Sequence, residues 1–368
     1  MKTFIFLLSF LSFFLATSPN SNLQAALVDI SLTCRGGGSF QAALNTACET
    51  LEEDAEADAN KGLPNIKLDE FSKGFANAAV ISTKGAGTDY ANDFSIFLIS
   101  AGVGIGADTR NKTLSDSSSD GDLTGGVAIM PHLTLGLNMN MLPIPKLGPI
   151  DFSKMDVFLN AFNYNISRDQ DDMEVEGSVS SFGLMVRYDL MDSISFVPGG
   201  IVKWGGIQMH TGYQYSKMQI EISSEQDFEE EEEITGVANA TANIEGTAEA
   251  NLDITSAVHT IPVEFSTSIQ LLYVFSLYGG LGFDFNSGTN KSDLDVDGDI
   301  DGTVSLGGAT ITGDVSVNED ESKKPDSLFT RGFMGAQFNI PYFKIYLEGH
   351  KVFGKNVVAA NVGFKILF

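Results

Sequence analysis

The residues best placed to hold an ion are four aspartates at alternate positions, Asp293, Asp295, Asp297 and Asp299. The first three, with Gly298 in the sixth position, match the opening of an EF-hand calcium loop. The twelfth position holds Val304 instead of the bidentate glutamate that such a loop requires, and no helical pattern flanks the segment. The same alternation fits a strand with carboxylates on its wet face. Two interpretations therefore stand: a weak Ca²⁺ site and a solvated acidic segment.

The two cysteines, Cys34 and Cys48, lie close together behind a segment typical of exported proteins. Lys2 precedes an apolar run from Thr3 to Ala16, which is too short for a membrane-spanning helix, so we expect residues 1–25 to be a cleaved signal peptide. In an exported chain a disulfide between the cysteines is the default expectation. The mature chain is predicted to start near Ala26 or Leu27, without a lipid anchor.

Ten segments of the remaining chain alternate between apolar and polar residues, as strands with one apolar face do. On one of them, Phe182, Leu184 and Val186 oppose Gly183, Met185 and Arg187. The expected strands are Asp93–Ala107, Thr124–Met141, Lys154–Ser167, Glu176–Leu190, Ile194–Ile222, Val258–Tyr273, Leu277–Asn286, Ser327–Ile340, Tyr342–Phe353 and Asn356–Phe368. Ten is an even number, as a single-chain membrane barrel requires, with twelve as the alternative.

All of the long connections between these segments fall on one side, together with one tight turn at Gly354-Lys355, and this supports the strand count. The long connections are 108–123, 168–175, 223–257 and 289–326. Together with Glu176 they hold 29 of the 48 acidic residues, in a chain whose formal net charge is −26. We therefore expect long acidic loops at one end of a nearly neutral wall, and the net charge argues against binding of nucleic acid.

The chain ends on Asn361-Val362-Gly363-Phe364-Lys365-Ile366-Leu367-Phe368, a strand that finishes on a bare aromatic residue. This octapeptide resembles the closing strand and assembly signal of bacterial outer-membrane β-barrel proteins. The resemblance implies insertion into outer-membrane lipid by the barrel assembly machinery, which would recognise Asn361–Phe368. A further resemblance, to surface adhesin families, is carried by no single motif.

Charged residues on the inward faces of the expected strands would line the lumen. They are Arg187, Asp189, Glu264, Asp284, Arg331, Lys344, Glu348 and Lys365. Ten strands enclose little space, so we favour a filled or plugged interior over an ion-conducting lumen. A plug is available before the first strand, where Ser39–Asn60 has helical periodicity and Ala78–Ser82 has the composition of a short strand.

No catalytic pattern stands out. Ten-stranded outer-membrane proteases use an Asp-x-His pair, and none of the histidines, His132, His210, His259 and His350, has Asp two residues before it. We therefore expect no enzyme and no cofactor apart from a possible Ca²⁺.

The sequence thus predicts an all-β, transmembrane antiparallel barrel at 93–368, preceded by a helical plug or periplasmic segment at 26–92. Its place would be a bacterial outer membrane, with the acidic loops facing the exterior. The expected function is surface-exposed binding of an extracellular protein or cation, or a structural role. The alternative is a porin-like channel for small solutes or cations.

Overall fold

The computed structural model describes most of the chain from Asp29 onward. The described residues are 29–36, 41, 45–46, 48–50, 52–53, 68–85, 88–91, 96–110, 125–141, 146–148, 150–170, 173–197, 201–233, 241–304 and 309–368. The expected signal peptide, residues 1–25, lies outside this part of the chain.

Ten antiparallel strands form a closed ring, which confirms the predicted barrel and its strand number. In order around the ring they are β2 (Phe97–Asp108), β3 (Gly126–Asn138), β6 (Met155–Gln170), β7 (Met173–Met191), β9 (Val202–Glu233), β10 (Thr241–Leu271), β11 (Phe275–Val304), β13 (Leu328–Ile340), β14 (Phe343–Val352) and β15 (Val357–Leu367). The last strand pairs with the first, Phe364 opposite Ala101. The C-terminal segment therefore closes the ring.

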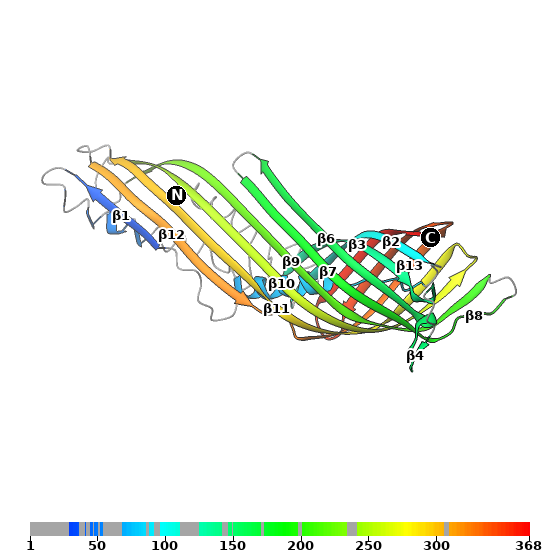
Figure 1. Ribbon diagram of the computed structural model, residues 1–368. Helices are drawn as coiled ribbons and strands as arrows, with labels where there is room; N and C mark the ends of the chain where they lie inside the picture. Colours follow the sequence, from blue (N-terminus) through cyan, green and yellow to red (C-terminus); the bar gives the residue numbers. More distant parts are fainter. Residues whose placement is uncertain are drawn as a thin grey trace.

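Strands β9, β10 and β11 continue far beyond the ring and form a projecting sheet (Figure 1). Its outer strands are β12 (Ala309–Lys323), which pairs with β11, and β1 (Asp29–Arg35), which pairs with β12. The prediction of loops at 223–257 and 289–326 was therefore wrong for most of both ranges. Their acidic residues alternate with apolar residues that pack on one face of the sheet, including Leu294, Val296 and Ile300.

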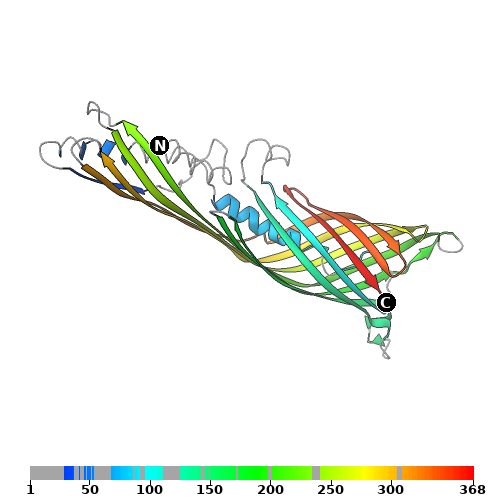
Figure 2. The ribbon, with the colours of Figure 1, turned by 90° about the horizontal axis from the view of Figure 1, so that it is seen from above.

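Helix α3 (Leu68–Ser82) runs from the projecting sheet into the mouth of the barrel (Figure 2), so the short strand expected at Ala78–Ser82 was a wrong prediction. Ala78, Val80 and Ile81 are fully buried there. A helix satisfies its own backbone hydrogen bonds, which suits a segment that is surrounded by barrel wall. Within the helix expected at 39–60, the described residues are helical.

The ring turns apolar side chains outward and polar side chains inward. Ile105, Ile129, Leu281, Leu347 and Val362 are among the exposed apolar residues, whereas the interior holds buried charges. Such a continuous apolar outer face would be unfavourable in water and is typical of a wall that contacts lipid.

Short elements occupy the end of the ring where β2 begins. They are η2 (Met139–Met141), β4 (Lys146–Leu147), β5 (Ile150–Asp151), η3 (Phe152–Lys154) and β8 (Ile194–Ser195). The described part of the chain contains no helix that is long and apolar enough to cross a membrane.

Candidate functional site

The first candidate site is the lumen, which a single segment of the chain fills. Helix α3 enters from the projecting sheet, where Leu68 packs with Ile30 and Leu294, and the described residues 83–85 and 88–91 follow it in the chain. Lys84 and Tyr90 are each about 1% exposed, and Asp89 is completely buried. We call the described residues 68–85 and 88–91 the plug.

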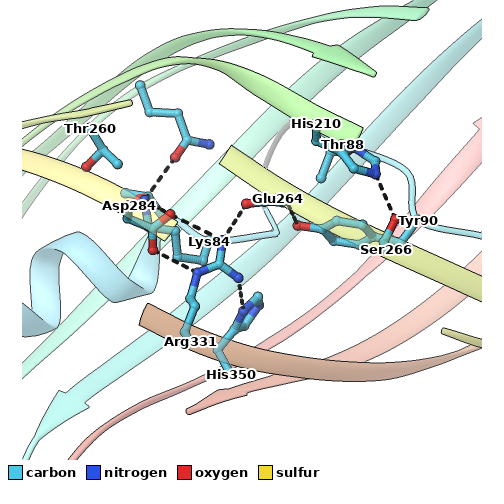
Figure 3. A network of polar contacts seen from close by, with 12 residues as sticks. Lys84, Thr88, Tyr90, His210, Thr260, Glu264, Ser266, Asp284, Arg331 and His350 are labelled. Atoms are coloured by element: carbon cyan, nitrogen blue, oxygen red, sulfur yellow. Dashed lines mark hydrogen bonds and ion pairs between the residues drawn. The ribbon is translucent and has the colours of Figure 1, made fainter. Parts of the chain in front are cut away.

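Arg331 lies at the centre of the interior and joins four strands (Figure 3). Its Nε donates to Asp284 Oδ2 at 2.8 Å, and its Nη2 donates to Glu264. Its Nη1 lies 2.8 Å from His350 Nδ1. From the plug, the Lys84 ammonium lies 3.6 Å from Asp284 Oδ1. Two cations therefore compensate two buried carboxylates, as burial of charge requires.

Further along the plug, hydroxyl groups satisfy the polar groups of the wall (Figure 3). Tyr90 donates to Glu264 Oε2 at 2.7 Å, and Thr88 Oγ1 lies 2.8 Å from His210 Nδ1. The other ring nitrogen of His210 lies 2.8 Å from Ser266 Oγ. Both ring nitrogens of His210 thus lie within hydrogen-bond distance of a hydroxyl group, one from the plug and one from the wall, which holds the plug in place.

Asp89 anchors the plug nearer the end of the ring where β2 begins. Its Oδ1 accepts from Lys365 Nζ at 2.8 Å, and its backbone carbonyl accepts from Arg187 Nη1 at 2.6 Å. Arg187 also donates from Nε to Asp156 Oδ2 at 2.8 Å. The plug thus contacts both ends of the polar interior.

The second candidate site is the outer face of the projecting sheet, which carries rows of carboxylates. Strand register places Glu176, Glu221, Asp253, Asp293 and Asp320 side by side on five strands, from β7 to β12. A second row brings Glu225, Glu249 and Asp297 together, and a third pairs Asp299 with Asp314. We call these rows the carboxylate face. Like charges directly opposite on neighbouring strands are destabilising, so this face is costly to the fold.

A comparison with protein-family models matches residues 22–368 to a family described as Lsa36-like. The chain belongs to the Lsa36-like family. A comparison with curated proteins finds no match. Membership covers the plug, the ring and the projecting sheet together.

Among solved structures, this Lsa36-like chain is similar to several bacterial barrels. The translocator domain of the autotransporter NalP from Neisseria meningitidis is 10% identical, with a TM-score of 0.29 and coverage of 76% of this chain and 91% of that one. The attachment invasion locus protein Ail of Yersinia pestis is 12% identical, with a TM-score of 0.22 and coverage of 74% and 97%. CarO of Acinetobacter baumannii is 10% identical, with a TM-score of 0.22 and coverage of 60% and 95%. Because these scores are low, the fold assignment rests on the strand ladders of this chain.

Seven of the eight charged residues predicted to face the lumen are buried inside the ring of the Lsa36-like protein. They are Arg187, Glu264, Asp284, Arg331, Lys344, Glu348 and Lys365. Asp189, the eighth, is half-buried. The sequence did not single out their plug partners Lys84, Asp89 and Tyr90, which lie in a Gly- and Ala-rich segment without clear periodicity.

The four aspartates predicted as a weak calcium site, Asp293, Asp295, Asp297 and Asp299, lie on one face of extended β11. They do not curve around a common point as an EF-hand loop does. The described residues contain no cluster of acidic, His or Cys side chains arranged to hold a metal. Calcium binding at this face stays a prediction. The Cys34–Cys48 disulfide is present, and it packs with Ala309 and Ile311 of β12.

Asp326 links the plug to the rim of the ring through ion pairs and hydrogen bonds. These contacts predict that the stability of the protein depends on pH. Its carboxylate accepts from Lys73 at 2.8 Å and from Lys355 at 2.5 Å, and its backbone N–H donates to Asn77 Oδ1 at 2.9 Å. Partial burial alone would raise the pKa of Asp326, but the hydrogen bonds and charges of the two lysines outweigh it and lower the pKa to about 2.

Because the unfolded pKa is about 3.9, this stabilisation is complete above about pH 5 and is lost as the pH falls towards 2. We expect Asp326→Asn to remove about 1 to 2 kcal/mol of stability at pH 7, after allowance for solvent screening, and less at pH 2. Urea unfolding across this pH range measures it. Asp192→Asn, which removes an exposed pair with Lys154 at 2.6 Å, serves as control. Equal losses for Asp326→Asn at pH 7 and pH 2 would contradict the assignment.

Proposed function

We propose that this Lsa36-like protein is a plugged, non-conducting barrel of a bacterial outer membrane that presents its carboxylate face to a basic partner outside the cell. The carboxylate row across five strands carries the proposal. Rows of like charge lower the stability of the sheet, because the carboxylates repel one another. A partner of opposite charge would neutralise them and relieve this repulsion. The partner expected is a protein segment rich in lysine and arginine.

The carboxylate face begins just beyond the apolar outer wall. The last aromatic row on this side contains Tyr215 and His259, which lie opposite each other on β9 and β10. Lys217 and Lys291 follow, and the row of Glu221 comes next. In the described parts of β9 to β12, no basic side chain lies beyond these lysines on this face. If the apolar wall lies in lipid, the carboxylates stand directly outside the headgroups, accessible to a partner.

The alternative, a porin-like channel, gains no support from the lumen. A conducting path requires space that the side chains of Lys84, Tyr90 and Arg331 fill. For this reason surface binding is favoured over solute passage.

Binding of a polylysine peptide to the refolded protein tests the proposal. We expect Asp293→Asn, Asp295→Asn, Asp297→Asn and Asp299→Asn combined to weaken binding about tenfold, at roughly 0.3 to 0.5 kcal/mol per exposed charge. The salt dependence of binding should also become shallower.

Glu319→Gln combined with Glu321→Gln is the matched control. Both residues lie on β12, on the opposite face of the same sheet, so this variant should bind polylysine with near wild-type affinity. An equal loss of binding free energy per removed charge in the two variants, about half the total loss in this control, would reject the carboxylate face as the contact and leave net charge alone as the cause.

A further inference from the structure

The wall of the ring is incomplete at one place. Strand β3 pairs with β6 only from Thr134 opposite Asn160 to Asn138 opposite Asp156. On the side of the projecting sheet, residues 126–133 of β3 and 161–170 of β6 run on without pairing with each other, while β6 stays paired with β7 throughout. We call this gap the seam.

The two sides of the seam differ in how their inward-facing side chains are covered. On β3, Ala128, Met130 and His132 are between 1% and 2% exposed. On β6, the face that carries buried Phe158 and Asn160 continues with Phe162, Tyr164 and Ile166, because side chains alternate along a strand. Yet Tyr164 is 53% exposed and Ile166 is 44% exposed. Apolar side chains on the inner face of β6 are therefore uncovered.

Helix α3 explains the asymmetry. Gly74 lies so close to β3 that a Cβ there would be 2.6 Å from the backbone nitrogen of Gly126. Phe75 and Ala78 pack with Ala128 and Met130. The helix thus closes the lumen behind β3. No hydrophobic cluster of the described residues includes Phe162, Tyr164 or Ile166.

The seam opens at the edge of the apolar outer wall. Val127 and Ile129 of β3 are exposed apolar residues on the outer face, as is Phe182, which lies opposite Ala161 on β7. Beyond Ala161 the outer face of β6 becomes polar with Asn163 and Asn165. The seam therefore lies where acyl chains meet headgroups. Unpaired strand edges cannot face hydrocarbon without cost, but headgroups and interfacial water can bond to them.

We propose that the seam holds one membrane lipid, with its acyl chain entering at Phe162 and its headgroup end beside Tyr164, Ile166 and the unpaired strand edges. The lining offers no charged side chain on the inner face of β6 between Asn160 and Ile166, which suits an alkyl chain. This inference rests on the membrane location in the proposed function but not on the carboxylate face.

Quenching by brominated lipid tests the seam. In a Trp204→Phe background, Phe162→Trp places the indole on the inner face at the seam, and Phe182→Trp places it on the outer wall. Phe158→Trp places it on the inner face of the same strand where β3 is paired, and Tyr278→Trp is a second interior control in case Phe158→Trp does not fold. Each variant is refolded into phosphatidylcholine vesicles with bromine at carbons 6 and 7 of one chain.

We expect Phe162→Trp and Phe182→Trp each to lose more than half of their fluorescence, and the interior controls to lose little. Adding Leu133→Cys and Ala161→Cys should close the seam under oxidation and restore the fluorescence of Phe162→Trp, and reduction should reverse this. Quenching that survives oxidation, or fluorescence of Phe162→Trp that matches the interior controls, overturns the seam alone. Absence of quenching in Phe182→Trp overturns the membrane location and the seam with it.

Discussion

Replacing Arg331 with methionine is expected to lower the free energy of unfolding by about 3 to 5 kcal/mol. Methionine has a similar length but no charge, so the substitution removes the cation with little change in volume. Asp284 and Glu264 are both buried and would retain only Lys84 at 3.6 Å and the hydroxyl of Tyr90. An uncompensated buried carboxylate is among the costliest defects in a protein interior.

Urea unfolding in lipid vesicles, followed by the fluorescence of Trp204, measures this loss. Lys291→Met is the matched control, because it removes a cation from the exposed outer face of β11 and should change stability by no more than about 0.5 kcal/mol. Adding Asp284→Asn to Arg331→Met should recover part of the loss, since it removes one of the stranded charges. A loss below about 1 kcal/mol would mean that water reaches the interior, in conflict with the plug.

The number of strands could be predicted from the sequence because alternation and connection length constrained it together. Where the alternation and the connection length did not indicate the same boundary, the predicted end of the strand was wrong. The expected strands Val258–Tyr273 and Leu277–Asn286 placed a turn between Tyr273 and Leu277, but the turn lies at Leu272–Val274, where Leu272 and Tyr273 adopt positive φ of 53° and 63°. Apolar residues rarely take this conformation, so they were assigned to the preceding strand.

The projecting sheet was missed because its charge density resembles that of a solvated loop. Asp293 to Asp301 alternate with residues that include Leu294, Val296 and Ile300, a pattern that fits a strand as well as a loop. What decided the outcome is distant in sequence: β1, β12 and helix α3 bury those apolar side chains. A local pattern cannot show which remote segment will cover a face.

The plug shows the same limit of local patterns, because its conformation depends on segments that are distant in sequence. Val80 and Ile81 are β-branched and favour a strand, yet they lie in a helix that packs against the barrel wall. The inward charges of the wall follow from strand parity, which is a local property. Their pairing with Lys84 and Asp89 spans up to 276 residues of chain and depends on the closed ring.

Removing the plug is expected to convert a silent barrel into a conducting one. A chain that begins at residue 92 lacks α3, Lys84, Asp89 and Tyr90 but keeps all ten ring strands. Single-channel recording in planar bilayers should show steady openings for this chain and none for the mature protein. Weak ion selectivity is expected, because the wall retains buried groups of both signs, among them Arg187, Arg331, Glu264 and Asp284.

A chain that begins at residue 66 is the matched control for this deletion, because it loses β1 and the disulfide but keeps the whole plug. It should remain silent, so that conductance is assigned to the interior and not to the missing N-terminal strand. Altered mobility of unheated samples in detergent gels shows that each chain has folded before recording. Steady current through the mature protein, or silence of a folded chain from residue 92, would show that the plug does not control passage. Either result would conflict with the contacts that Lys84, Asp89 and Tyr90 make with the buried charged residues of the wall.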